Sequence, residues 1–230
     1  MSSRRQLVLT GLAGVASYAA VQRAARTWGS TPVERRSRLP GDALVPDAPV
    51  VTDHARTVAA PPHAVWPWLT QVGWHLGGWY TPRWVDRLLF PDNWPNLDHL
   101  DPTLTRRLAV GDLIPDGPPG TAVFVVEQVE PERVLLLRST THLPPSWADR
   151  AAMEWTWCFV LTPTSDGGTR VHLRVRGRTS PWWLTLLYTA LVVPADLVMA
   201  PGMLRGLDRR ATHPGPPGVS GRAPYAGVTS

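Results

Sequence analysis

The sequence contains no lysine, a single cysteine and only three phenylalanines. Without lysine, the chain can use neither a Schiff-base amine nor the lysine of a phosphate-binding loop. The single cysteine, Cys158, excludes an internal disulfide and any site with several cysteine ligands. Cys158 stands in an apolar strand-like run, which predicts a small core residue. We therefore expect no metal and no cofactor.

Tryptophan is abundant where phenylalanine is scarce. The chain has 230 residues, twelve tryptophans and 43% apolar residues, which is enough for one folded domain with extensions or for two small domains. Indole joins a large apolar face to one N–H donor, so tryptophan suits partly wet cavities and membrane interfaces.

The net charge of +5 is concentrated near the N-terminus. Seven arginines and one acid, Glu34, lie between Arg4 and Arg38, and the remainder of the chain is nearly balanced. A nucleic-acid-binding protein would carry its basic residues as a patch on the folded domain. We therefore expect no nucleic-acid partner.

Residues 1–27 stand apart from the rest. Arg4 and Arg5 precede an uncharged run from Leu7 to Val21, which is shorter than the roughly 20 residues of a membrane span. The segment is compatible with a twin-arginine-like export signal, an uncleaved anchor or an ordinary amphipathic helix. We expect a membrane-related role, as anchor or export signal. The side of the membrane stays open, because arginines flank both ends of the run.

Composition divides the remaining chain into three parts. Residues 28–49 are proline-rich and predict an extended linker, residues 50–212 predict the folded domain, and residues 213–230 predict a disordered tail. Inside the domain, a strand at 50–60 ends at a double-proline corner. A helix then starts near Ala64, and a second short helix covers Arg83–Leu89.

Strand patterns dominate the middle of the domain. The runs 121–129, 133–139, 153–161 and 169–178 alternate apolar and polar residues, and the turn 165–168 joins the last two as a hairpin. A long apolar helix follows, from Pro181 to about Ala211. This order predicts an α+β fold in which the last helix lies against a curved antiparallel sheet.

Three stretches resemble the START-like or SRPBCC superfamily, in particular its polyketide cyclase/dehydrase-like members. They are Val58-Ala59-Ala60-Pro61-Pro62 followed by Val65-Trp66-Pro67-Trp68-Leu69, the hairpin around Trp157–Pro163 and Gly168–Val171, and the closing helix around Met203–Arg210. The resemblance implies a helix-grip fold, with a seven-stranded antiparallel sheet wrapped around a long C-terminal helix and two short helices after the first strand. It also implies a cavity for hydrophobic ligands, and it transfers no catalytic residue.

Strand alternation selects the hairpin members of the candidate cavity wall, and the aromatic residues of the segment 58–80 join them. The hairpin should turn one face inward, so we predict an aromatic cavity wall, with ordinary core packing as the alternative. Its members are Trp68, Trp79, Tyr80, Trp155, Trp157 and Phe159.

The opposite face of the last strand carries Arg170, His172, Arg174, Arg176 and Arg178. We expect a solvated face paired with acids such as Glu127 and Glu154, rather than a site for anionic lipid headgroups.

Candidates for acid–base chemistry show no recognisable catalytic spacing. They are His54, His142, His172, Glu154 and Asp86, and we expect surface or capping roles for each. The acidic residues near His99 lack the spacing of a calcium loop and predict a polar loop. Trp182–Leu204 fits either a membrane span or a helix buried in the grip. We favour the buried helix because Pro194, Asp196 and Pro201 interrupt the run.

The sequence thus predicts a domain that binds a hydrophobic small molecule or lipid in an internal cavity and associates with a membrane through its N-terminus. We expect binding rather than catalysis. One alternative is a cyclase/dehydratase-type enzyme that uses a cavity histidine or acid as general base. The other is a membrane-associated accessory protein that acts through its surface. The oligomeric state stays open.

Overall fold

The computed structural model describes residues 2–221, except the side chains of Ser2, Arg4 and Leu7. Its centre is an antiparallel sheet in the order β1-β6-β5-β4-β3-β2. The strands are β1 (Val50–Val58), β2 (Leu113–Pro115), β3 (Val123–Glu130), β4 (Val134–Ser139), β5 (Ala152–Pro163) and β6 (Thr169–Ser180). The helices are α1 (Ser2–Thr27), α2 (Pro32–Arg36), α3 (Pro62–Thr70), α4 (Arg83–Leu89), the short η1 (Pro145–Trp147), α5 (Trp182–Leu187), the π-helical η2 (Tyr188–Val192) and α6 (Val193–Thr212).

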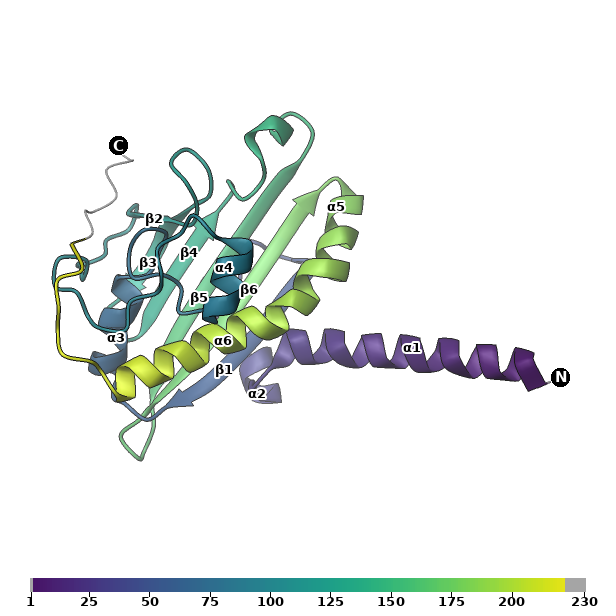
Figure 1. Ribbon diagram of the computed structural model, residues 1–230, viewed down its shortest axis with the longest axis horizontal. Coiled ribbons are helices and arrows are strands. Elements are labelled where there is room, and N and C mark those ends of the chain that lie inside the picture. The colour runs from purple at the N-terminus through teal and green to yellow at the C-terminus, as the bar shows by residue number, and fades with distance from the viewer. Residues whose placement is uncertain (1, 222–230) are drawn as a thin grey trace.

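The predicted α+β class, the C-terminal helix on the sheet and the two short helices after the first strand are confirmed (Figure 1). The predicted number of strands is wrong, because the sheet has six strands and not seven. The stretch between α4 and β2 forms a loop. It contains Pro91, Pro95 and Pro102, which lack the N–H that a strand ladder needs.

The β5–β6 hairpin supplies most of the inward face. Trp155, Phe159 and Leu173 are buried on that face, as the alternation predicts. α6 crosses this face and packs against β1 and α3. Gly206 lets it approach closely, because a Cβ there would lie 2.2 Å from the carbonyl oxygen of Tyr80.

The outer face of β6 differs from the prediction. The segment 31–47, predicted as an extended linker, contains α2 and covers the face of β6 that carries the arginines. Arg174 is buried between Asp53 and Asp42, at 2.8 and 3.0 Å. Glu34 of α2 holds Arg170 at 2.7 Å. The expected solvated face with Glu127 and Glu154 as partners is therefore wrong, because both of those acids pair with Arg138.

The C-terminal helix is buried only in its second half. Leu204 and Leu207 lie in the core, whereas Trp182, Leu186 and Leu191 are largely exposed. The expectation of a helix buried along most of its surface is therefore wrong for α5 and η2. By length and composition alone, Trp182–Thr212 qualifies as a membrane-spanning helix, and 17% of its apolar window is buried.

α1 projects away from the domain, as Figure 1 shows. Its C-terminal end is part of the domain, because Ala25 is fully buried and Gln22 donates to the Thr189 carbonyl at 2.6 Å. At the other end of the chain, the backbone N–H of Ser220 donates to Asp101 at 2.7 Å. The described part of the predicted disordered tail, 213–221, therefore has defined contacts, and residues 222–230 lie outside the described residues.

Candidate functional site

A cavity lies between the inward face of the sheet, the loops around Trp74 and Asp116, and the C-terminal helices η2 and α6. Its volume is about 150 Å³. Most of its wall is aromatic or aliphatic, and a few polar side chains break that surface. This combination is typical of sites for small organic molecules.

Three aromatic side chains form one side of the wall. Trp79, Phe124 and Trp157 contact one another with ring centroids 5.1 to 5.7 Å apart. Trp155 and Tyr188 form a second pair, at 4.4 Å. Such tilted and edge-on pairs stabilise one arrangement of rings beyond simple area burial. These contacts between the rings therefore fix the shape of the cavity wall.

Gly177 makes room for the Trp155 ring. The two residues face each other across β5 and β6, and a Cβ at position 177 would lie 2.0 Å from the indole. The ring thus occupies the space that any side chain at 177 would need. This close packing ties Trp155 to the cavity wall.

The structure separates the six predicted cavity residues into two groups. Trp79, Trp155 and Trp157 line the cavity. Trp68, Tyr80 and Phe159 lie in the surrounding core instead. Tyr80 donates its hydroxyl to the carbonyl of Trp68 at 2.8 Å, so these two residues brace each other behind the wall.

A histidine–carboxylate pair stands in the wall at Asp116 and His142. Nε2 of His142 lies 2.7 Å from the Asp116 carboxylate, and the Ser139 hydroxyl lies 2.7 Å from Nδ1. An ionised carboxylate only accepts, so Nε2 donates to it, and in the neutral ring Nδ1 then accepts from the serine hydroxyl. The histidine therefore orients Asp116 and is itself held by Ser139.

A second pair, His54 and Asp196, stands where β1 meets α6. Nε2 of His54 lies 2.8 Å from Oδ2 of Asp196, and the Thr52 hydroxyl donates to the same oxygen at 3.4 Å. His54 is fully buried, and its Nδ1 has no hydrogen-bond partner within residues 2–221. Asp196 lines the cavity in front of this histidine.

Asp86 is the third carboxylate on the cavity wall. It accepts a hydrogen bond from the Thr81 hydroxyl and one from the Asn96 amide, the latter at 2.6 Å. Burial raises the pKa of Asp86 above its usual range, although these two bonds oppose the rise. Asn96 also accepts from the backbone N–H of Tyr80 at 3.0 Å, so Asp86 helps to hold that loop together.

Tyr188 lies in the electrostatic field of both Asp116 and Asp196. Burial raises the pKa of its phenol above the ordinary value, and the negative charges of Asp196 and Asp116 raise it further. The hydroxyl therefore keeps its proton at neutral pH and is available as a donor to a bound molecule.

The sequence pattern singled out His54, His142 and Asp86, but it did not identify Asp116 or Asp196. No local signal marks them, because each meets its histidine only through the fold. Two other candidates lie elsewhere: Glu154 pairs with Arg138, and His172 pairs with Asp53. Among the residues that the structure describes, no group of three histidine, cysteine or acidic side chains is arranged to hold a metal ion.

No protein-family model matches the sequence, and no curated protein matches it. Solved structures match it in fold. DynU16, from the dynemicin biosynthetic locus, is 19% identical with a TM-score of 0.40, over 71% of this chain and 48% of its own. CalU16 from Micromonospora echinospora is 18% identical with a TM-score of 0.34, over 70% and 83%. Truncated norcoclaurine synthase from Thalictrum flavum is 12% identical with a TM-score of 0.42, over 71% and 94%. This likeness concerns the fold and assigns no ligand or reaction.

Proposed function

We propose that this protein binds a small hydrophobic molecule in the cavity between β5, β6 and the C-terminal helices. The observation that carries the proposal is the aromatic wall around a volume of about 150 Å³. The combination of an antiparallel sheet, a closing helix and the residues named above also supports membership of the START-like superfamily. Apolar burial would supply most of the affinity, and the few polar groups would orient the ligand.

The size of the cavity favours a small ligand over a whole lipid. A cavity of about 150 Å³ is known to hold a single benzene ring, and the volume here is the same. A membrane lipid with two acyl chains is many times larger. We therefore infer that the ligand is a ring compound or a short-chain molecule, or that only part of a larger molecule enters.

Native mass spectrometry of the purified full chain tests this proposal. We expect a co-purifying small molecule that organic extraction removes. The Trp157→Ala variant, which removes one side of the aromatic wall, should retain less of it. The matched control is Trp147→Ala, on a half-exposed tryptophan of η1 away from the wall. Purified protein that carries no ligand, and whose tryptophan fluorescence does not respond to toluene or indole, would contradict the proposal.

We also propose that α1 holds the domain at a membrane. Leu9 and Leu12 of α1 are exposed by 63% and 61%. The helix projects away from the domain (Figure 1). Vesicle flotation tests this attachment. Leu9→Glu combined with Leu12→Glu should abolish flotation, whereas Val33→Glu combined with Val110→Glu, on exposed residues elsewhere, should not. Equal flotation of both double variants would contradict an anchoring role for α1.

The two histidine–carboxylate pairs favour a second candidate, an enzyme of the cyclase/dehydratase kind. A cavity carboxylate that is oriented by a histidine can remove a proton next to a carbonyl group. Phenylacetone in deuterium oxide provides a test by NMR. Protein-dependent exchange of its α-protons that Asp116→Asn slows would support catalysis, and no exchange above the buffer rate would exclude this chemistry for that ketone.

A further inference from the structure

The cavity wall carries three acidic side chains and, among the described residues, no arginine. The acids are Asp86, Asp116 and Asp196. Lysine is absent from the whole chain. A bound anion would thus meet carboxylates with no arginine or lysine beside them, whereas a bound cation would meet complementary charge.

Two of these carboxylates keep an oxygen free. Asp116 and Asp196 each use Oδ2 for their histidine, and within residues 2–221 no donor contacts Oδ1 of either. Their side chains are 21% and 27% exposed, so they are accessible. Asp86 differs, because both of its oxygens already accept hydrogen bonds from Thr81 and Asn96. Asp116 and Asp196 are therefore the acids that can accept from a ligand.

The aromatic wall suits a cation as well as an apolar ring. Tryptophan and tyrosine faces attract ammonium groups, most strongly where water is excluded. The protein uses this interaction with its own arginines outside the cavity: Arg205 lies over Trp28 at 4.9 Å, and Arg210 lies over Tyr80 at 4.8 Å. Inside the cavity, Trp155 and Tyr188 have no such cation among the described residues.

Unpaired donors are an independent sign of a missing polar partner. Trp74, Trp79 and Trp155 line the cavity and are 5%, 9% and 5% exposed, and their indole N–H groups have no partner in the described part of the chain. Buried donors in folded proteins are nearly always paired. A ligand that also carries an acceptor, such as a hydroxyl oxygen, would complete this wall.

We propose that the cavity selects a protonated hydrophobic amine, with its ring against the tryptophan wall and its ammonium group near Tyr188, in the field of Asp116 and Asp196. This inference rests on the proposed binding function and narrows it to one class of ligand. The ammonium group would donate to a free oxygen of Asp116 or Asp196, and the histidine bound to the other oxygen would hold that carboxylate in place.

Three probes of nearly equal shape test the charge preference: 2-phenylethylamine, 2-phenylethanol and phenylacetate. Their affinities for the full chain are measured by titration calorimetry at about pH 8, well above the pKa of about 6.5 of a free imidazole. We expect the amine to bind about tenfold more tightly than the alcohol, and the carboxylate to bind more weakly than the alcohol. Equal or reversed affinities of amine and alcohol would overturn the inference and leave the proposed function intact.

Substitutions of Asp116 and Asp196 test whether these two acids cause the preference for the amine over the alcohol. The double variant Asp116→Asn with Asp196→Asn keeps the shape of both side chains and should reduce the amine preference to about threefold or less. Its affinity for the alcohol should fall much less than its affinity for the amine, because a neutral amide can still hydrogen-bond a hydroxyl group. The alcohol binding that remains reports an intact cavity. Asp149→Asn, on an exposed acid outside the cavity, should behave like the wild type.

The remaining outcomes are also decisive. If the double variant loses the alcohol as well, the two single variants are compared, because each keeps one carboxylate. An amine preference that survives intact in the variants overturns the role of these acids. Binding without charge preference contradicts the inference alone. Failure of all three probes to bind to protein from which co-purified molecules have been extracted contradicts the inference, and the absence of any co-purified molecule then contradicts the proposed function as well.

Discussion

Trp155 lies on the cavity wall because the residue across from it has no side chain. Its ring fills the space over Gly177, and any Cβ at that position would overlap the indole. The ring also contacts Tyr188, with the two ring centroids 4.4 Å apart. At the scale of single residues, the cavity therefore depends on a glycine as much as on the aromatic residues around it.

Gly177→Ala should displace the Trp155 ring. Because the core is close-packed, we expect a loss of about 1–3 kcal/mol in the free energy of unfolding, measured by urea denaturation, and weaker ligand binding. Thr162→Ala, on an exposed position of β5, should change stability by less than about 0.5 kcal/mol. A Gly177→Ala protein as stable as the wild type would show that the ring moves freely.

Cys158 should be chemically inert in the folded protein. Burial raises the pKa of its thiol to about 12, with a further contribution from the charge of Asp42. Iodoacetamide reacts with the thiolate, so mass spectrometry should find no modification of native protein at about pH 8 and complete modification in guanidinium. Rapid alkylation of the native chain would contradict the buried position.

At the scale of elements, α2 and the segment around it act as a cover for the outer face of β6. Arg174 is buried beneath them, donates to the carbonyls of Glu34 and Arg35 at 3.0 Å and pairs with Asp53. Buried arginines need this kind of complete pairing, because an unpaired charge in the interior is very costly. The segment 31–47 is therefore part of the domain.

Glu34→Gln should weaken this cover in a pH-dependent way. The hydrogen bonds from Arg170 lower the pKa of Glu34 to about 2, against the opposing effect of burial. A carboxyl group whose pKa is lower in the folded than in the unfolded chain stabilises the fold at pH values above its unfolded pKa of about 4.3. This stabilisation is lost as the pH falls through the pKa of the group in the folded chain. In urea denaturation at neutral pH, we expect the variant to be about 0.5–1 kcal/mol less stable than the wild type.

The difference between Glu34→Gln and the wild type should shrink between about pH 4.3 and the folded pKa of about 2. Glu132→Gln is the matched control, since Glu132 is exposed and has no ion pair among the described residues. A stability difference that does not depend on pH would mean that the charge of Glu34 has no part in the effect.

Gly206 of α6 lies against the loop after α3, so a side chain at this position should disturb the packing. A Cβ there would lie 2.2 Å from the backbone oxygen of Tyr80, which cannot rotate away. Gly206→Ala should therefore lower the free energy of unfolding by about 1–3 kcal/mol in urea denaturation. Gly14→Ala, in the open part of α1, should not destabilise the chain, because nothing lies within 4 Å of its Cβ position. Equal stabilities of the two variants would contradict this packing.

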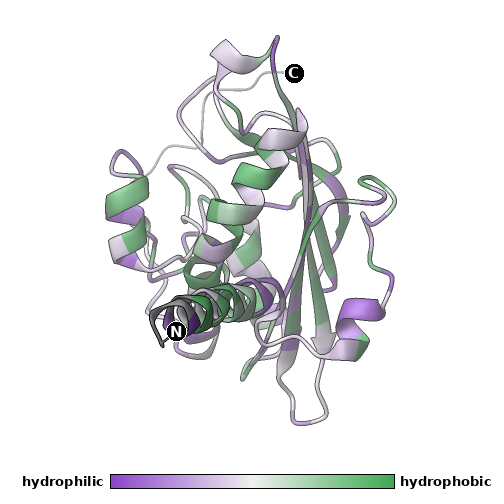
Figure 2. Ribbon diagram, turned by 90° about the vertical axis from the view of Figure 1, so that its right-hand side faces the viewer, coloured by the Kyte–Doolittle hydropathy of each residue, from purple (hydrophilic) through white to green (hydrophobic). Residues whose placement is uncertain are grey.

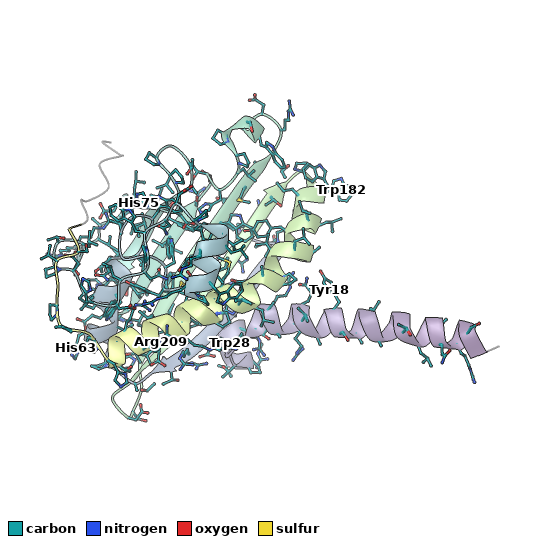
Figure 3. The ribbon with its side chains drawn as sticks, in the orientation of Figure 1. Tyr18, Trp28, His63, His75, Trp182 and Arg209 are labelled. Carbon is teal, nitrogen blue, oxygen red and sulfur yellow. The ribbon has the colours of Figure 1, made fainter. Side chains whose placement is uncertain are left out.

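At the scale of the whole molecule, two exposed apolar surfaces lie on one side. Figure 2 looks toward the N-terminal end of α1, and the apolar turns of α5 lie on the same face. Tyr18 and Trp182 mark these two surfaces on the same side of the domain in Figure 3. Tyr18 of α1 also donates to the carbonyl of Ala190 in η2, at 3.1 Å, so the two elements touch.

We therefore expect α5 and η2 to contribute to vesicle binding beside α1. Leu186→Glu combined with Leu191→Glu replaces two side chains that are 58% and 63% exposed. The double variant should float with anionic vesicles several-fold less than the wild type, because each charge opposes burial in the interface. Its thermal stability should stay unchanged. Val33→Glu combined with Val110→Glu again controls for added charge, and equal flotation of the two would contradict a membrane-facing α5.

Local patterns were sufficient for much of the fold. Alternation predicted the inward face of β5 and β6, turn residues predicted the hairpin between them, and helical periodicity predicted α4 with its observed bounds. Each of these signals depends on neighbours within a few residues along the chain. Trp155 and Trp157 of β5 line the cavity together with Trp79 from the loop after α3, whereas Trp68 of α3, Tyr80 of the same loop and Phe159 of β5 lie in the surrounding core.

The amino-acid pattern alone specified a tryptophan-rich domain without lysine, built from alternating strands and closed by an apolar helix. The three-dimensional fold set which polar groups meet. Asp116 and His142 are 26 residues apart, and His54 and Asp196 are 142 apart. Neither pair leaves a local pattern, because the sheet and α6 bring them together through space. The same folding decided that segment 31–47 covers the arginines and that the helix after β6 leaves its first turns exposed.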